Sequence, residues 1–235
     1  MEGRIFRKYR CSRRGFSLDE TSNAPRDGPG PVAGASAPWF ETHDGIRFFL
    51  ENTPFRQIFY ASDYRFDDIG RDDIVLDIGA NAGAFCIRAA RLSDHVFCVE
   101  PLTTDILARN ILLNGCRAVI LDLALGDGSP MEVMWDGLSK TMPTVTLGTI
   151  IKIAGGCDFL KCDCEGAEWL IRPGDLAGIR RIEMELHIPP ICGRPDPALL
   201  DYIGKNYEIH LDRVPAHGPL GLLGYLHAER PGPGV

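Results

Sequence analysis

The chain has 235 residues, of which 45% are hydrophobic and 24% are charged, which is enough apolar sequence for one domain with a buried core. Its formal net charge of -7 argues against a general polyanion binder, because contacts to phosphates need clustered lysine and arginine. No stretch approaches the roughly 20 apolar residues of a membrane helix, and no apolar region of a secretory signal follows the basic residues 1–14, so we expect a cytoplasmic protein without membrane contact.

The first 37 residues have the composition of a flexible tail. They are rich in arginine and then in serine, asparagine, proline and glycine, and such a segment cannot bury enough apolar surface to offset its chain entropy. Six basic residues fall within residues 1–14. They indicate either a solvated arm or an arm that contacts RNA or another acidic partner.

Residues 38–70 precede the core of the predicted domain. His43-Asp44-Gly45 is typical of a turn, Ile46–Leu50 of a strand and Phe55–Tyr64 of a short helix. We expect this segment to lie over a cofactor or substrate, and a purely structural lid is the alternative.

After Gly70 the sequence alternates between strands and helices, and residues 71–235 are predicted to form the main domain. Strands that are near-continuous apolar runs, separated by helices, imply a parallel sheet covered on both faces. The predicted strands are Ile74–Ile78, Val96–Val99, Val119–Leu123, Phe159–Cys162 and Ile182–Leu186, and the predicted helices are Ala84–Leu92, Thr103–Asn114 and Gly166–Ile171. The segment Ala198–His227 predicts a further helix and one or two strands, with an antiparallel edge as one arrangement.

The first strand of this domain runs into a glycine turn, at the place where open parallel sheets bind their ligands. Gly79 and Gly83 tolerate a positive φ and let a ligand lie against the backbone. Asn81 stands where a dinucleotide fingerprint has its second glycine, and Asp77 would repel a pyrophosphate. We therefore expect Asp77, Gly79, Ala80, Asn81 and Gly83 to bind a cofactor with a cationic group and no phosphate, such as S-adenosylmethionine.

Two later segments complete the predicted cofactor site. The second strand ends in Glu100-Pro101, whose carboxylate can accept hydrogen bonds from both ribose hydroxyls. This acid would suit a nicotinamide cofactor as well, and a solvated strand end is the structural alternative. After the third strand, Leu123 and Ala124 are in position to contact the adenine.

The eight cysteines include no Cys-x-x-Cys pair of the kind that zinc and redox sites use. Cys86, Cys98, Cys162 and Cys164 lie within apolar runs, where cysteine behaves as a small hydrophobic residue. We therefore expect reduced thiols and no bound metal ion. A cluster at Cys157, Cys162 and Cys164 is the alternative, although its spacing suits no common set of ligands.

Three segments together resemble the FkbM-type methyltransferases, and they extend over Asp77–Gly83, Val99–Pro101 and Phe159–Glu168. The third, Phe-Leu-Lys-Cys-Asp-Cys-Glu-Gly-Ala-Glu, is the most specific, because the family has a phrase of the form Lys-x-Asp-x-Glu-Gly-x-Glu after a Thr-Leu-Asp-like approach. That approach appears here as Thr146–Thr149, with Gly148 where the family often has an acid. The match runs from about residue 44 to residue 187 and leaves the basic tail unexplained.

The resemblance implies the class I methyltransferase fold, a Rossmann-like α/β fold with a doubly wound, mostly parallel seven-stranded sheet. It also implies S-adenosylmethionine as the methyl donor. The reaction implied is O-methylation of a hydroxyl on a sugar, a polyketide or another small metabolite, and the resemblance does not specify which.

A hydroxyl acceptor loses its proton as it attacks the methyl group, so a base is expected nearby. The fourth strand places Asp163 at its carboxyl end, beside the expected methyl group, where it would also contact the cofactor. Glu165 and Glu168 fall at the start of the next helix, whose dipole favours carboxylates. Capping of that helix is therefore the alternative role for both residues.

Polar and apolar residues alternate along the fifth strand, which places Glu183, Glu185 and His187 on one face. A strand buried on both faces rarely carries three such groups, so either this face is solvated or its carboxyl end opens on the active site. We favour the second arrangement for Glu185 and His187. The predicted general base is His187 or Asp163, with Glu165 and Glu185 orienting the acceptor, and a packed, hydrogen-bonded histidine is the alternative for His187.

Four other interpretations stay open. The carboxylates of Asp163, Glu165 and Glu185 could instead hold Mg²⁺, as oxygen-rich clusters can. The basic tail could serve an RNA methyltransferase, although the acidic body of the protein disfavours one. An NAD-dependent oxidoreductase is disfavoured by Asn81. The last alternative is a binding module that has kept the fold without catalysis.

Overall fold

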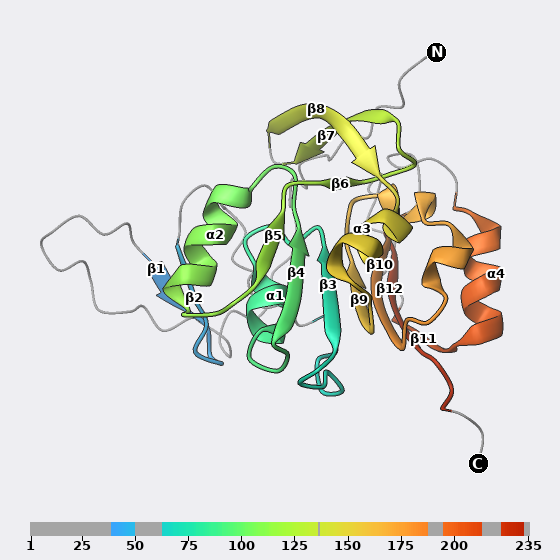
Figure 1. Cartoon of the computed structure of the whole chain (residues 1–235), viewed down its shortest axis with the longest axis horizontal. Helices are drawn as coiled ribbons and strands as arrows, with labels where there is room; N and C mark the ends of the chain where they lie inside the picture. The colour runs from blue at the N-terminus through green and yellow to red at the C-terminus, as the bar shows by residue number, and fades with distance from the viewer. Residues whose placement is uncertain (1–38, 50–62, 136, 188–194, 213–221, 233–235) are drawn as a thin grey trace, which may run out of the picture.

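The computed structural model describes residues 39–49, 63–135, 137–187, 195–212 and 222–232 (Figure 1). The tail predicted over residues 1–37 lies outside the described residues. So does the helix predicted over residues 55–64, apart from its last two positions.

A seven-stranded sheet forms the centre of the molecule (Figure 1). Its strands are β3 (Ile74–Ile78), β4 (His95–Val99), β5 (Val119–Leu121), β9 (Phe159–Cys162), β10 (Arg181–His187), β11 (Glu208–Asp212) and β12 (Leu222–Glu229). The order is β11-β12-β10-β9-β3-β4-β5, in which the five strands from β10 to β5 are parallel and β12 runs antiparallel to both of its neighbours. The predicted mostly parallel α/β sheet is therefore confirmed, with the antiparallel strand next to one edge.

Helices cover both faces of this sheet because neighbouring strand residues point to opposite sides. Val75 and Phe159 pack in one hydrophobic cluster with α1 (Ala84–Ala89) and α2 (Thr104–Leu113). Leu76 and Leu160 pack in a second cluster with α3 (Leu147–Ala154) and α4 (Pro197–Asn206). Two 3₁₀ helices, Ala167–Leu170 and Pro173–Leu176, add to the second cluster. Among the described residues no helix has the length and apolar character needed to cross a membrane.

The described part of the pre-core segment divides between two places. The hairpin of β1 (Trp39–Glu41) and β2 (Arg47–Phe49) packs against α2, where the backbone N–H of Phe49 donates to Oδ1 of Asn110 over 3.0 Å. Asn110 in turn donates from its side chain to the carbonyl of Ala82, at the glycine turn. The hairpin thus supports the turn through α2, whereas residues 63 and 64 lie at the cavity described below.

A second, three-stranded sheet and helix α3 were not predicted. The sheet consists of β6 (Ala124–Leu125), β7 (Pro130–Trp135) and β8 (Leu138–Val145), and it extends across the upper part of the molecule in Figure 1. Trp135 pairs with Leu138, so residues 136 and 137 connect the two strands. The sequence Asp-Gly at these two positions, after apolar residues in alternation, is a hairpin signal that would have predicted this element.

Helix α3 begins after Thr146, whose hydroxyl caps it by accepting from the backbone N–H of Thr149. Its second residue, Gly148, is where the FkbM-type family often has an acid. A Cβ at Gly148 would lie 2.6 Å from Oδ1 of Asp175, so a neighbouring carboxylate fills this space and a larger residue would collide with it. The six cysteines among the described residues are free thiols. Cys86, Cys98 and Cys162 are buried as their apolar neighbours predict, whereas Cys164 is only half-buried because it lies beyond the end of β9, at the cavity.

Candidate functional site

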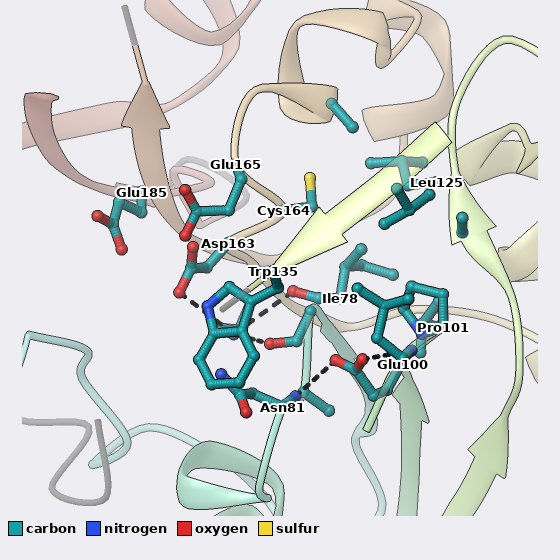
Figure 2. Close-up of a pocket in the computed structure, with 18 of the residues that line it drawn as sticks. Ile78, Asn81, Glu100, Pro101, Leu125, Trp135, Asp163, Cys164, Glu165 and Glu185 are labelled. Carbon is teal, nitrogen blue, oxygen red and sulfur yellow. Dashed lines mark hydrogen bonds and ion pairs between the residues drawn. The ribbon is translucent and has the colours of Figure 1, made fainter. Parts of the chain in front are cut away.

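A cavity of about 380 Å³ lies at the carboxyl ends of β3, β4 and β9 (Figure 2). Its volume falls within the roughly 300–1,000 Å³ of typical small-molecule sites. Figure 2 shows Glu100 and Pro101 at one end and Asp163, Glu165 and Glu185 together at the other. The predicted site residues that line it are Gly79, Ala80, Asn81, Glu100, Pro101, Leu123, Ala124, Asp163, Glu165 and Glu185. Three further predicted residues, Asp77, Gly83 and His187, lie behind the lining.

The packing of the backbone requires a glycine at position 79. The φ of Gly79 is 76°, and a Cβ at this position would lie 1.8 Å from the carbonyl oxygen of Asp163. The glycine therefore lets the end of β3 touch the end of β9, which brings Asp163 to the turn. Gly83, with a φ of 95°, precedes α1, where a Cβ would lie 3.0 Å from both Ile87 and Leu107.

Glu100 is a buried carboxylate that accepts three hydrogen bonds, and it is not a solvated strand end. It is 6% exposed, and its Oε2 accepts from the backbone N–H of Asn81 over 2.8 Å. Its Oε1 accepts from the N–H groups of Leu102 and Thr103 at 2.8 and 3.0 Å. Asn81 itself has a φ of 50°, an uncommon conformation for a residue with a side chain. Glu100 therefore ties the glycine turn to the start of α2.

Asp77 and Lys161 form a buried ion pair beneath the turn. Nζ of Lys161 lies 3.0 Å from Oδ1 of Asp77 and donates to the carbonyl oxygen of Gly79 over 2.9 Å. Burial alone would lower the pKa of Lys161, but the charges of Asp77 and Asp163 outweigh it and hold that pKa above its ordinary value. Asp77, predicted to face the cofactor, instead faces Lys161 and accepts from the N–H of Cys86. Lys161 lines the cavity and was predicted only as part of the family phrase.

Tyr64 connects two of the predicted catalytic carboxylates. Its hydroxyl lies 3.1 Å from Oδ2 of Asp163 and 3.3 Å from Oε2 of Glu185, and it can donate to either. Nζ of Lys161 is 4.0 Å from the same oxygen of Asp163. The ends of β9 and β10 thus meet at a tyrosine from the pre-core segment, which the sequence did not indicate because that segment is far away along the chain.

His187 is held from behind by Glu168. The backbone N–H of His187 donates to Oε1 of Glu168 over 2.8 Å, and its ring Nδ1 lies 3.0 Å from the same oxygen. Oε2 of Glu168 accepts from the N–H of Gly166, so Glu168 caps the turn and holds the histidine at once. Nε2 of His187 then lies 3.4 Å from Glu185 and 3.6 Å from Glu165.

Two titrating groups at this end of the cavity have displaced pKa values. Burial and then the charge of Asp163 raise the pKa of Glu185 to about 7, although His187 acts in the opposite direction. For His187, burial would lower the pKa, but the charges of Glu165 and Glu168 together with its hydrogen bonds raise it well above the ordinary value. These shifts favour the protonated form of His187 at neutral pH, and they let Glu185 keep its proton at a higher pH than an exposed glutamate does.

Glu183, the third polar residue on this face of β10, is not part of the cavity. It is fully buried at the other end of the strand, where Nε of Arg181 lies 2.9 Å from its Oε1 and Nδ1 of His227 lies 2.6 Å from its Oε2. The backbone N–H of Arg65 also donates to it. Glu183 therefore anchors β12 and the pre-core segment to β10.

Asp163, Glu185 and His187 each place one ligand atom within 4.8 Å of the others. Their oxygens and imidazole nitrogen are of the types that hold Mg²⁺ or a transition metal ion. The sequence predicts no metal here, with Mg²⁺ at Asp163, Glu165 and Glu185 as an alternative. The geometry brings these residues close enough to share a cation.

Besides Phe85 of α1, three aromatic residues line the cavity. Tyr64, Trp135 and Tyr225 come from the pre-core segment, the end of β7 and the antiparallel strand β12. The rings of Tyr64 and Tyr225 meet edge to face, with their centres 5.9 Å apart. Of these three, only Trp135 had a usable signal in the sequence, which is the alternation of apolar residues along β7 before Asp-Gly. The positions of Tyr64 and Tyr225 depend on how distant segments pack.

No protein-family model matches the chain, and no curated protein matches its sequence. Among solved structures it is similar to an rRNA methylase from Streptococcus thermophilus, with a TM-score of 0.51 and 10% identity over 76% of this chain and 98% of that one. It is also similar to TYW2 of M. jannaschii in complex with AdoMet, with a TM-score of 0.47 and 15% identity over 85% of this chain and 90% of that one. Identities this low concern the fold alone, and the FkbM resemblance stays a prediction. The chain has the Rossmann-like fold of the methyltransferases.

Proposed function

We propose that the protein is an S-adenosylmethionine-dependent methyltransferase that methylates a hydroxyl group of a small molecule such as a sugar or a polyketide. One observation carries the proposal. A single cavity joins the buried carboxylate of Glu100, next to the glycine turn, to the carboxylates of Asp163 and Glu185 at the ends of β9 and β10. Such a cavity has room for a nucleoside at one end and an acceptor at the other.

The residues at the glycine-turn end fit this donor. Glu100 uses three hydrogen bonds from the backbone, and because a carboxylate has about four lone-pair sites, it keeps capacity for a ribose hydroxyl. Leu123 and Ala124 offer an apolar surface for the adenine, and Asp163 a negative charge for a cationic group. When bound, S-adenosylmethionine would supply a methyl carbon on a sulfonium, which an acceptor oxygen can displace while the electron pair of the broken bond stays on sulfur.

Glu185 is the general base in this proposal. It lines the cavity, and with a pKa raised to about 7 it can take up the hydroxyl proton near neutral pH. His187 lies behind the lining and is already protonated, so its proposed role is to position Glu185 and Glu165. Asp163 orients the acceptor through Tyr64. In this proposal residues 71–235 form the catalytic domain, and residues 38–70 add part of the cavity wall. The proposed location of the protein is the cytoplasm.

The proposal is tested by incubating the protein with methyl-labelled S-adenosylmethionine and separated small-molecule, glycan, lipid and RNA fractions. Label in the small-molecule or glycan fraction is expected. Label in RNA, lost on removal of residues 1–37, would favour the RNA methyltransferase instead. Binding of NAD with no binding of S-adenosylmethionine would favour an oxidoreductase. Binding of S-adenosylmethionine with no label in any fraction would favour a binding module. Activity that survives exhaustive chelation would exclude a required metal ion.

Glu100→Gln tests the donor end alone. Removing the charge from a buried acceptor of several hydrogen bonds is expected to weaken S-adenosylmethionine binding by about 10- to 100-fold, because hydrogen bonds to a charged group contribute roughly 1.5–3 kcal/mol. Calorimetric titration measures this without any acceptor. Glu208→Gln, an exposed residue on β11, is the matched control and is expected to bind as the wild type does.

A further inference from the structure

The acceptor end of the cavity is bounded by an acidic aromatic wall, the four residues Asp63, Tyr64, Glu185 and Tyr225. Asp63 and Tyr225 both line the cavity and interact electrostatically, and the hydroxyl of Tyr64 lies 3.3 Å from Oε2 of Glu185. The two tyrosine rings meet edge to face. Asp63 is exposed at the opening, whereas the side chain of Glu185 is 17% exposed, so the wall runs from the solvent into the site.

The charged residues that line the cavity are mostly acidic. Of the described residues that line the cavity, Asp63, Glu100, Asp163, Glu165 and Glu185 are acidic, and Lys161 is the single basic one. The ammonium of Lys161 is shared with Asp77 at 3.0 Å, outside the lining. An acceptor that carries a phosphate or carboxylate would meet like charges here, which costs binding energy.

The aromatic residues of the wall favour an acceptor with a positive charge. Ring faces attract cations, and a desolvated contact of this kind contributes about 2 kcal/mol. The wall already holds one such group, since Nζ of Lys161 lies 5.4 Å from the centre of the Tyr64 ring. Asp63 adds a carboxyl group that interacts electrostatically with Tyr225, the second ring of the wall. A carboxylate beside an aromatic ring, near the solvent, is a good site for an ammonium group.

We propose that the methyl acceptor carries a protonated amino group, which binds to Asp63 and Tyr225 at the opening while its hydroxyl faces Glu185. The acceptor class is thus a small amino alcohol, such as an amino sugar or an aminocyclitol. This inference rests on the proposed methyltransferase function. In the transfer, the hydroxyl oxygen forms the new bond to the methyl carbon, its proton passes to Glu185, and the amino group remains unchanged.

The charge of the labelled product tests this inference separately from the methyltransferase function. The protein is incubated with methyl-labelled S-adenosylmethionine and a small-molecule extract of its own cells. The labelled products are first separated from the unreacted donor, which is itself a cation, by reversed-phase chromatography, and they are then passed over ion exchangers at pH 7. We expect the label to be retained on the cation exchanger and to lose this retention after N-acetylation. Label in the neutral or anionic fraction overturns the inference while the methyltransferase function stands. No label in any fraction overturns the function, and the inference with it.

A charge-specific variant supplies a second readout. Asp63→Asn keeps an acceptor for the Tyr225 hydroxyl and removes only the charge, so KM for the acceptor is expected to rise about tenfold with kcat unchanged, whereas Asp63→Glu restores it. In the presence of S-adenosylhomocysteine, ultrafiltration with the extract should retain a cationic compound on the wild type and much less of it on Asp63→Asn. Asp201→Asn, exposed on α4, is the matched control. Equal retention by both variants, or a retained compound without positive charge, contradicts the inference.

Discussion

Oε1 of Glu168 accepts a hydrogen bond from the backbone N–H of His187 over 2.8 Å. The ring Nδ1 of His187 lies 3.0 Å from the same oxygen. Glu168 is fully buried, and its other oxygen accepts from the N–H of Gly166. One side chain therefore fixes the turn after β9 and the end of β10, the two elements that carry Asp163 and Glu185.

Glu168→Ala is expected to destabilise the fold by about 3–5 kcal/mol, because it leaves buried N–H donors without an acceptor and a buried imidazolium without its nearest counter-charge. Urea unfolding followed by circular dichroism measures the loss. Glu208→Ala, at an exposed position, controls for the removal of a carboxylate and should change stability by less than about 0.5 kcal/mol. A loss below about 1 kcal/mol for Glu168→Ala would show that the turn is held by other contacts.

Gly79→Ala is predicted to be far more damaging than the same change at Gly45. The two glycines have nearly the same φ, 76° and 74°, but a Cβ at Gly79 would lie 1.8 Å from the carbonyl of Asp163, whereas nothing lies within 4 Å of a Cβ at Gly45. Gly45→Ala therefore reports the backbone strain alone, about 1–2 kcal/mol. Thermal unfolding compares the two variants, and similar losses would mean that β3 and β9 can separate without cost.

The raised pKa of Glu185 predicts a stability that falls as pH rises. Its pKa is about 7 in the folded protein against an ordinary value of 4.5, so between these two pH values the folded state binds more protons than the unfolded state. The contribution is complete below pH 4.5 and is lost as pH rises through about 7, and the shift corresponds to at most about 3 kcal/mol. Urea midpoints between pH 5 and 8 measure the slope. Glu185→Gln should reduce it, and an unchanged slope would place the titration elsewhere.

The parallel strands and the glycine turn could be predicted because their signals are local. Apolar runs of four to five residues define β3, β4 and β9, and the glycines of the turn stand where φ is positive. Glu100 could be placed for the same reason, since it directly follows a buried strand. The seven-stranded sheet then follows from the alternation of strands and helices.

The rest of the site depends on contacts between distant segments. Tyr64 reaches Glu185 across 121 residues, and Tyr225 joins the wall through an antiparallel strand whose place in the sheet no local pattern gives. Sequence alternation correctly put His187 and Glu185 on one face, but it could not show that Glu168 holds the histidine behind the carboxylates that line the cavity. The sequence predicts His187 or Asp163 as the general base, and our proposal assigns this role to Glu185 instead.

The pairing of Asp77 with Lys161 was missed because it depends on strand register. The two residues are directly opposite each other in the pairing of β3 with β9, and a shift by one residue would place their side chains on opposite faces of the sheet. The sequence therefore suggested a ligand for Asp77, whereas the structure gives it a buried partner.

Lys161→Met is expected to cost about 3–5 kcal/mol, because it leaves the carboxylate of Asp77 buried without its partner. Adding Asp77→Asn removes the stranded charge, so the double variant should be more stable than Lys161→Met alone. Urea unfolding of the four proteins gives the coupling free energy of a double-mutant cycle. We expect a coupling of at least about 2 kcal/mol, since both partners are at most 5% exposed. Strictly additive losses would mean that the two charges do not interact in the folded protein, and that Lys161 acts only through its hydrogen bond to the carbonyl of Gly79.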